Sequence, residues 1–180
     1  MKTLKYFVFV FLVLLNVSCS SDEDSSVSDN TNTITIGQSV YNLKSAIISN
    51  SINGVYISLV NKTESQIDSS FNGTTLQQFN SFSANIPSIA LTETTYDLSD
   101  ISYLDFVVDG DLIYGELENE TTLFYKNGDN PDLEVISGSI TLTNYTVDNI
   151  ELTFEFERAD GIQISGTYKG GFVFIENSDA

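Results

Sequence analysis

Apolar and polar residues alternate along most of the chain from residue 33 onward. The clearest stretch is 149–157, where every second residue is Ile, Leu or Phe and three of the residues between them are glutamates. A period of two gives a strand one apolar face and one polar face, so the strand packs on a core and leaves its other face in water. No window from residue 33 onward has the 3.6-residue period of a stable helix. The pattern predicts an all-β domain.

The C-terminal residues predict a meander of antiparallel strands. Turns are expected at 146–148 and at Asp160-Gly161, because Asp-Gly readily adopts the positive φ that tight hairpins require. Gly170-Gly171 predicts a bulge or bend. The expected strands cover 139–143, 149–157, 162–168 and 171–175.

The N-terminal half predicts shorter strands with less regular patterns. Turns are expected at Gly37-Gln38 and Asn53-Gly54, and a further hairpin at Asp109-Gly110. The mostly polar segment 61–75 predicts a long surface loop. The expected strands cover 33–36, 40–43, 46–48, 55–60, 76–86, 94–98, 103–108, 112–117 and 122–125.

About ten short strands separated by frequent turns favour an antiparallel β-sandwich, with a lipocalin-like β-barrel as the alternative. From residue 19 onward the chain has 9 Phe and 8 Tyr residues, which are enough for an aromatic core without disulfides. We expect one such domain over residues 33–180.

The N-terminus has the features of a secretory signal peptide. Two lysines within residues 1–5 precede an apolar run at 6–15 that is too short to span a bilayer, and the small residue Ser18 follows. Residues 14–19, Leu14-Leu15-Asn16-Val17-Ser18-Cys19, resemble the bacterial lipoprotein signal, with Asn16 where Leu is more usual. The resemblance implies removal of residues 1–18 and attachment of fatty acyl chains such as palmitate to Cys19, which is the only cysteine. Several acyl chains would anchor the protein firmly in a membrane. The alternative is a soluble secreted protein with an incidental cysteine.

Residues 19–32 predict a disordered, acidic tether, since only one residue between 20 and 32 is apolar. Its root-mean-square reach would be roughly 20 Å. The cluster Ser21-Asp22-Glu23-Asp24 resembles the export signal that sends Bacteroidota lipoproteins to the cell surface. The resemblance implies an outer-membrane protein exposed at the surface, and the alternative is an anchor that faces the periplasm.

Three further segments, 37–43, 137–142 and 160–170, resemble a group of small Bacteroidota lipoproteins with a β-sandwich-like domain and largely unassigned function. Their motifs are typical of turns and strands. The resemblance therefore implies a fold and a compartment, and no activity.

The composition argues against most enzyme classes and against nucleic-acid binding. The chain has no His, which removes the imidazole of a Ser or Cys triad and an imidazole metal ligand, and no Ser-X-X-Lys stretch occurs. Its 7 basic and 25 acidic residues give a formal charge of −18, and loss of residues 1–18 leaves 5 bases, a charge of −20. Such a surface repels phosphate backbones. We expect no enzymatic activity.

Two sets of acidic residues are weak candidates for chemistry. Glu155 and Glu157 share the polar face of one strand about 7 Å apart, a spacing compatible with an inverting glycoside hydrolase, although a solvated strand face explains them better. Asp129, Asp132 and Glu134 lie in one loop whose oxygens suit calcium, although its Asn-Gly-Asp-Asn-Pro stretch is first of all typical of a turn. Asp109-Gly110-Asp111 is weaker still. We expect no catalytic residue, no metal and no cofactor.

The function expected from the sequence is that of a non-catalytic binding or adhesion module at the cell envelope. Its partners would be the membrane, through Cys19, and a glycan or protein ligand. Tyr103, Tyr114 and Tyr168 are expected in the core, with a platform for sugar rings as the alternative. A binding module should expose an apolar or concave patch. The alternatives are the glycoside hydrolase and a structural or assembly lipoprotein.

Overall fold

The computed structural model describes residues 32–176, and strands dominate this range. The predicted all-β class is confirmed. The signal peptide, Cys19 and the tether up to residue 31 lie outside the described residues. The strands are β1 (Thr33–Ile36), β2 (Ser39–Asn42), β3 (Ser45–Ser51), β4 (Gly54–Val60), β5 (Leu76–Ile86), β6 (Thr95–Asp97), β7 (Tyr103–Ile113), β8 (Glu116–Glu118), β9 (Thr121–Tyr125), β10 (Val135–Tyr145), β11 (Asn149–Arg158) and β12 (Gln163–Glu176).

The strands form one open sheet in the order β6-β10-β11-β12-β3-β4-β5-β7-β8. The β1–β2 hairpin is attached to β12, and β9 is attached to β7. Neighbouring strands are antiparallel except for β12 and β3, which pair in parallel from Phe172↔Ala46 to Glu176↔Asn50. The expectation of a wholly antiparallel sheet is therefore wrong at this pair. The reason is that the last strand of the chain docks beside the third, and no hairpin joins them.

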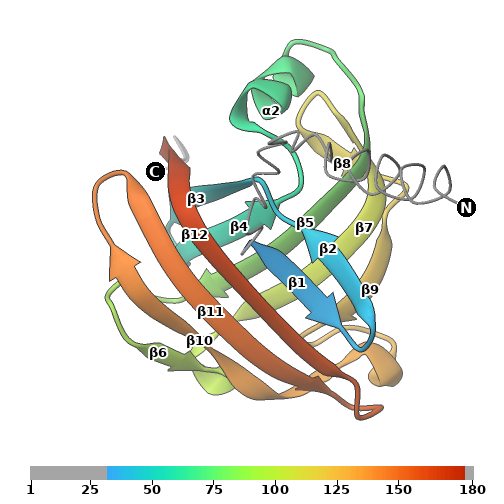
Figure 1. Ribbon diagram of the computed structural model, residues 1–180, viewed down its shortest axis with the longest axis vertical. Coiled ribbons are helices and arrows are strands. Elements are labelled where there is room, and N and C mark those ends of the chain that lie inside the picture. The colour runs from blue at the N-terminus through green and yellow to red at the C-terminus, as the bar shows by residue number, and fades with distance from the viewer. Residues whose placement is uncertain (1–31, 177–180) are drawn as a thin grey trace, which may run out of the picture.

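The sheet folds over so that its two halves enclose the core. In Figure 1, β10–β12 with the β1–β2 hairpin lie in front of the layer that contains β3–β5 and β7. The rings of Phe82 on β5 and Phe154 on β11 stack at 4.4 Å with an interplanar angle of 5°. Four steps in the sheet separate these strands, so the stacking takes place across the interior. The expected division into separate sheets is not seen, because β12 belongs to both halves.

A short helix, α2 (Glu64–Phe71), occupies the segment predicted as a loop over 61–75, and that prediction is wrong. Thr63 and Gln66 form a capping box, which satisfies backbone N–H groups at the helix start. Ile67 is buried with Val60, Leu76, Phe79 and Leu112 in a small second cluster. Only Ile67 and Ser70 of the helix are buried, so the segment lacks the repeated apolar positions from which a helix could be predicted. Two 3-10 turns, Leu98–Asp100 and Pro131–Leu133, complete the described helices.

Most predicted turns are confirmed, and the one at Asp109-Gly110 is wrong. The hairpins at Gly37-Gln38, Asn53-Gly54 and Asp160-Gly161 connect neighbouring strands as expected. In contrast, β7 continues through Asp109, whose φ is 56° and whose N–H donates to Asn80 Oδ1 at 3.0 Å. Asp109, with its positive φ, therefore lies in a bulge of the β5–β7 ladder, and no hairpin turn forms there.

Asn32, expected at the end of the tether, is held by the domain. Its side chain donates to Lys169 O at 3.1 Å and accepts from Lys169 N at 2.8 Å, and its carbonyl accepts from Leu43 N at 2.9 Å. These bonds tie the start of β1 to β12. Between residues 32 and 176, no helix has the length and apolar character that crossing a bilayer requires.

Candidate functional site

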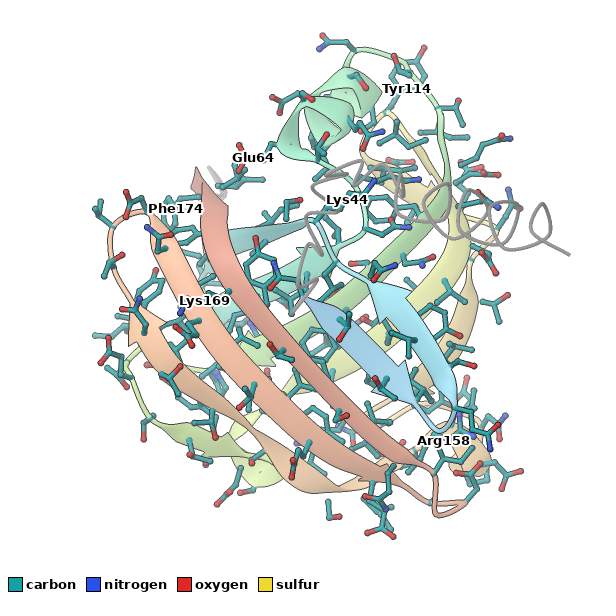
Figure 2. The ribbon with its side chains drawn as sticks, in the orientation of Figure 1. Lys44, Glu64, Tyr114, Arg158, Lys169 and Phe174 are labelled. Carbon is teal, nitrogen blue, oxygen red and sulfur yellow. The ribbon has the colours of Figure 1, made fainter. Side chains whose placement is uncertain are left out.

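An apolar hollow of about 560 Å³ opens beside the end of β12. We call it the edge hollow, and its lining residues are Tyr145, Thr146, Val147, Phe172 and Phe174. Two strands and a turn supply it, because Tyr145 ends β10, the next two residues belong to the turn before β11, and the phenylalanines lie on β12. Figure 2 labels Phe174 near the end of that strand.

The edge hollow exists because β12 continues for five residues beyond the end of its pairing with β11. The pairing of β11 with β12 ends at Asn149↔Gly171, and from Phe172 onward β12 pairs with β3 on its opposite side. Within the described range, no strand pairs with residues 172–176 on the side that β11 has left. Phe172 and Phe174 share one face of the strand, since side chains alternate with a period of two.

Large apolar side chains remain in contact with water here. Phe174 is 49% exposed and Val147 is 93% exposed. Phe172 is half-buried, and its ring stacks on Tyr145 at 5.6 Å, so the wall of the hollow is held in place. An unpaired strand edge with apolar side chains favours aggregation unless something covers it, and extended peptides bind at such edges. An extended peptide could therefore pair with residues 172–176 as an additional strand and bury one of its own apolar side chains in the edge hollow.

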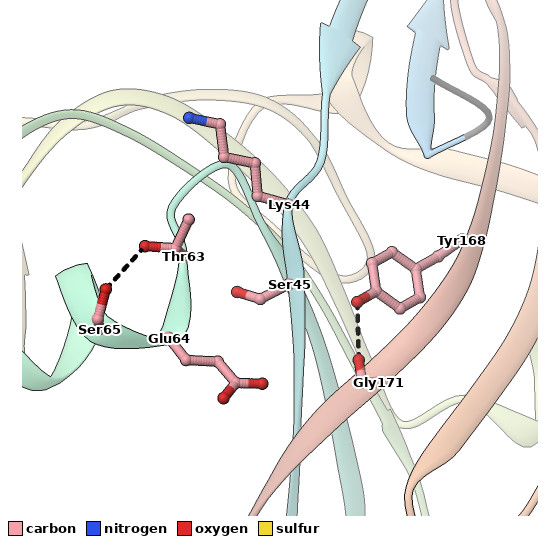
Figure 3. A pocket seen from close by; sticks show the side chains of 7 residues that line it. All are labelled: Lys44, Ser45, Thr63, Glu64, Ser65, Tyr168 and Gly171. Atoms are coloured by element: carbon pink, nitrogen blue, oxygen red, sulfur yellow. Dashed lines mark hydrogen bonds between the residues drawn. The ribbon is translucent and has the colours of Figure 1, made fainter. Parts of the chain in front are cut away.

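A second, polar hollow of about 380 Å³ lies where β12 leaves β1 and joins β3, close to the start of α2 (Figure 3). The Tyr168 hydroxyl donates to Gly171 O at 2.7 Å, and Ser45 Oγ donates to Lys62 O at 2.6 Å. Glu64 and Lys44 also line it. Because its hydroxyl groups hold backbone carbonyls, this hollow serves chiefly to stabilise the junction of the strands.

The structure does not bring Glu155 and Glu157 into a cleft. Glu155 is exposed and Glu157 is half-exposed on the outer face of β11, and neither lines the two hollows above. The arrangement is that of a solvated strand face.

The loop with Asp129, Asp132 and Glu134 is built from its own hydrogen bonds. Glu134 accepts from Asn127 N at 2.8 Å with one oxygen and from Gly128 N at 3.2 Å with the other. Asp129 and Asp132 are exposed. Over residues 32–176, no three acidic side chains gather as metal ligands. The structure therefore does not bring the three candidates together as one group of ligands.

The tyrosines divide between core and surface. Tyr168 is 2% exposed, as expected for core packing, whereas Tyr103 is 43% exposed and Tyr114 is 69% exposed, so the core prediction is wrong for these two. Tyr114 lies at the turn between β7 and β8, beside Gly73 after α2. The Tyr103 hydroxyl donates to Asp105 Oδ2 at 2.5 Å on the outer face of β7.

Asp105 is partly buried on that face. Burial raises its pKa, while hydrogen bonds from Tyr103 and Ser83 act in the opposite direction. Burial, followed by the hydrogen bond to Asp105, likewise raises the pKa of Tyr103. This pair lines neither of the hollows described above.

The sequence did not identify the edge hollow as a site, although the signals were present. Phe172 and Phe174 were expected on one face of a final strand. They are partly exposed because the pairing of β11 with β12 stops at Asn149↔Gly171, before the phenylalanines. The turn 146–148 adds an isolated Val147 among polar residues. Comparisons of the chain with family models, with curated proteins and with solved structures give no match.

Proposed function

We propose that the protein is a lipid-anchored, non-catalytic binding module of the outer membrane, which binds an extended segment of a partner protein at the edge hollow. The observation that carries the proposal is the exposed Phe174 on a strand whose outer edge has no partner strand among residues 32–176. A bound segment would continue the sheet beside β12 and place one apolar side chain between Tyr145 and Phe174.

The location is part of the same proposal. It is supported by the lipoprotein signal that ends at Cys19, by the acidic tether, and by the resemblance to small Bacteroidota lipoproteins. A tether of roughly 20 Å would let the domain meet partners some distance from the membrane. The acidic residues after Cys19 favour the cell surface over the periplasmic face.

The test uses the purified, lipidated protein in detergent micelles and a displayed library of random peptides. Peptides that bind should contain alternating apolar residues, and their affinity should fall at least tenfold for Phe174→Ser. The matched control is Ile136→Ser, because Ile136 is 57% exposed, at the start of β10, and does not line the edge hollow.

Hydrogen exchange locates the bound peptide. We expect slower exchange of the amides of residues 172–176 when the peptide is present, since a new strand would accept or donate hydrogen bonds there. The proposal is wrong if the selected peptides bind Phe174→Ser as well as the unchanged protein, or if protection falls elsewhere on the domain.

A further inference from the structure

The β3–β4 hairpin brings together two lysines that are 18 positions apart in the chain. Its register pairs Ser45 with Val60, so Lys44 and Lys62 flank the open end of the hairpin. Lys44 N donates to Val60 O at 2.7 Å, which fixes one backbone segment beside the other. Figure 2 shows Lys44 close to α2 and away from Phe174.

These lysines line a polar hollow of about 340 Å³, which we call the amide–lysine hollow. Its volume lies within the range of small-ligand pockets, about 300–1,000 Å³. The other walls come from β2, from β5 and from the residue that follows β4, and their lining residues are Val40, Tyr41, Asn42, Asn61, Gln78 and Asn80. It shares Lys44 with the polar hollow of Figure 3 and shares no residue with the edge hollow.

Hydrogen bonds fix the floor of the amide–lysine hollow. Lys62 Nζ donates to Gln77 O at 2.7 Å, and Asn61 Nδ2 donates to Gln78 O at 2.8 Å. Gln78 has a φ of 52°, so the bulge in β5 turns these two carbonyls toward the residues that follow β4. Because such left-handed backbone is costly for a residue other than glycine, the surrounding bonds must hold it in place.

The donors of the hollow are only partly used by the protein. Asn80 Oδ1 accepts from Asp109 N at 3.0 Å, which directs the acceptor of this amide toward β7 and leaves its NH₂ group to donate. Tyr41 supplies an aromatic wall, and its ring is fixed by an edge contact with Phe106 at 5.2 Å. Amide donors beside a fixed aromatic ring suit the hydroxyl groups and apolar faces of a sugar.

The charge of the hollow is unlike that of the rest of the chain, which has 25 acidic and 7 basic residues. Among residues 32–176, Arg158 pairs with Asp160 and Lys169 pairs with Glu151, whereas neither Lys44 nor Lys62 has a carboxylate within 4.0 Å. Burial, and secondly the charge of Lys44, lowers the pKa of Lys62. Two adjacent cations without a counter-ion in an acidic protein create a local preference for an anion.

We propose that the amide–lysine hollow binds an acidic sugar unit, with its carboxylate or sulfate group between Lys44 and Lys62 and its hydroxyl groups on Gln78 and Asn80. The rest of the surface repels polyanions, so the acidic unit belongs to a glycan that is otherwise mostly neutral. This site is separate from the edge hollow and does not depend on the function proposed there.

The test measures binding of defined sugars to the lipidated protein in micelles by calorimetry. A disaccharide that ends in glucuronic acid should bind, and its neutral counterpart that ends in glucose should bind at least tenfold more weakly. Glucose 6-sulfate distinguishes a sulfate ester from a carboxylate as the anionic group. Sodium sulfate alone tests the anion without the sugar, and it should bind more weakly than either acidic sugar.

The variants assign the binding to the hollow. Lys44→Gln with Lys62→Gln should reduce the affinity for the acidic sugar at least tenfold and remove its dependence on salt. Asn80→Ala should weaken the binding of the sugar and leave that of sulfate unchanged. The matched control is Lys169→Gln, an exposed lysine paired with Glu151 at 3.0 Å, which should bind as the unchanged protein does.

Three results would overturn the proposal. They are equal binding of the acidic sugar by the double lysine variant, equal binding of the neutral disaccharide, and equal binding of sulfate alone, which would reduce the site to a simple anion site. Thermal unfolding of each variant, with a midpoint within a few degrees of the unchanged protein, shows that a loss of binding is not a loss of folding. The peptide-binding variant Phe174→Ser should bind the sugar normally.

Discussion

The ring of Phe154 lies directly over Gly166, its partner on the neighbouring strand β12. A Cβ atom at Gly166 would come within 2.1 Å of a carbon of that ring. The absence of a side chain at Gly166 leaves room for the Phe154 ring, which stacks on Phe82 from the other half of the sheet. Gly166 therefore permits the close approach of the two halves at this point.

Replacing Gly166 with alanine should destabilise the domain. The buried Phe154 ring cannot move away, because Phe82 covers its other face, and such overpacking costs about 1–3 kcal/mol. Urea unfolding measures the change in free energy. Gly171→Ala is the control, since the nearest atom to its added Cβ is Asp148 O at 3.5 Å. An equal loss in the two variants would contradict the role of the ring.

Phe82 and Phe154 should show a direct coupling energy. We expect a double-mutant cycle with Phe82→Leu and Phe154→Leu to give a coupling of about 0.5–1.5 kcal/mol, the contribution of an aromatic pair beyond its buried area. The free energies of unfolding of the four proteins provide the measurement. Strict additivity would mean that each ring contributes only through its own burial.

Removal of the capping box should loosen α2 without unfolding the sheet. Thr63→Ala deletes the side chain that accepts from Gln66 N, and such a loss costs about 0.5–2 kcal/mol. Faster hydrogen exchange over residues 64–71 is the expected result. Asp68→Ala, an exposed change within the same helix, should leave exchange at its start almost unchanged. Equal exchange in Thr63→Ala and the unchanged protein would contradict this assignment.

Asp105 should make the folded state less stable as the pH rises. Burial raises its folded-state pKa above the ordinary value of 3.8, so the folded protein holds this proton more tightly than the unfolded chain does. The favourable contribution is complete below pH 3.8 and is lost as the pH rises through the folded pKa. Asp105→Asn should therefore gain stability relative to the unchanged protein between pH 4 and pH 7, as measured by urea unfolding at each pH.

The comparison must be made with an exposed acid, because the whole chain changes charge over this pH range. Asp129→Asn serves this purpose, since Asp129 is exposed in its loop. Its stability relative to the unchanged protein should vary less with pH than that of Asp105→Asn. A larger change for Asp129→Asn would show that net charge, and not burial, governs the difference.

The anchor proposed at Cys19 predicts where the protein is found in cells. Cys19→Ala should move it from the membrane fraction to the soluble fraction, and mass spectrometry of the unchanged protein should find an N-terminal peptide with acyl chains on that cysteine. Protease treatment of intact cells should remove the domain if it lies at the surface. Protection until lysis would instead support a periplasmic orientation.

The strands that follow a strict period of two were predictable from the sequence. Residues 149–157 became β11 with its apolar residues buried, because alternation alone decides which face packs. Prediction was wrong where a local signal was overridden by tertiary contacts. Asp109 is of a residue type that is common in hairpin turns. Here the strand continues through it, and its N–H donates a hydrogen bond to Asn80 Oδ1 of β5, which the sequence does not indicate.

The amide–lysine hollow could be predicted from the sequence only in part. Given the turn at Asn53-Gly54, pairing residues outward along the hairpin places Lys44 beside Lys62, so this part of the hollow could have been predicted. Gln78 and Asn80 could not, because they reach the lysines through a bulge in β5 that has no distinct sequence pattern. The edge hollow likewise depends on the change of partner along β12.

The parallel pairing of β12 with β3 links a strand that is synthesised early with the last of the described strands. Until residues 172–176 have been synthesised, one edge of β3 has no partner strand. The pairing of β12 with β3, which joins β11 to the strands beyond β3, is also missing. The chain therefore completes its sheet only after these residues have been synthesised. Deleting those five residues should leave a nascent chain that cannot close.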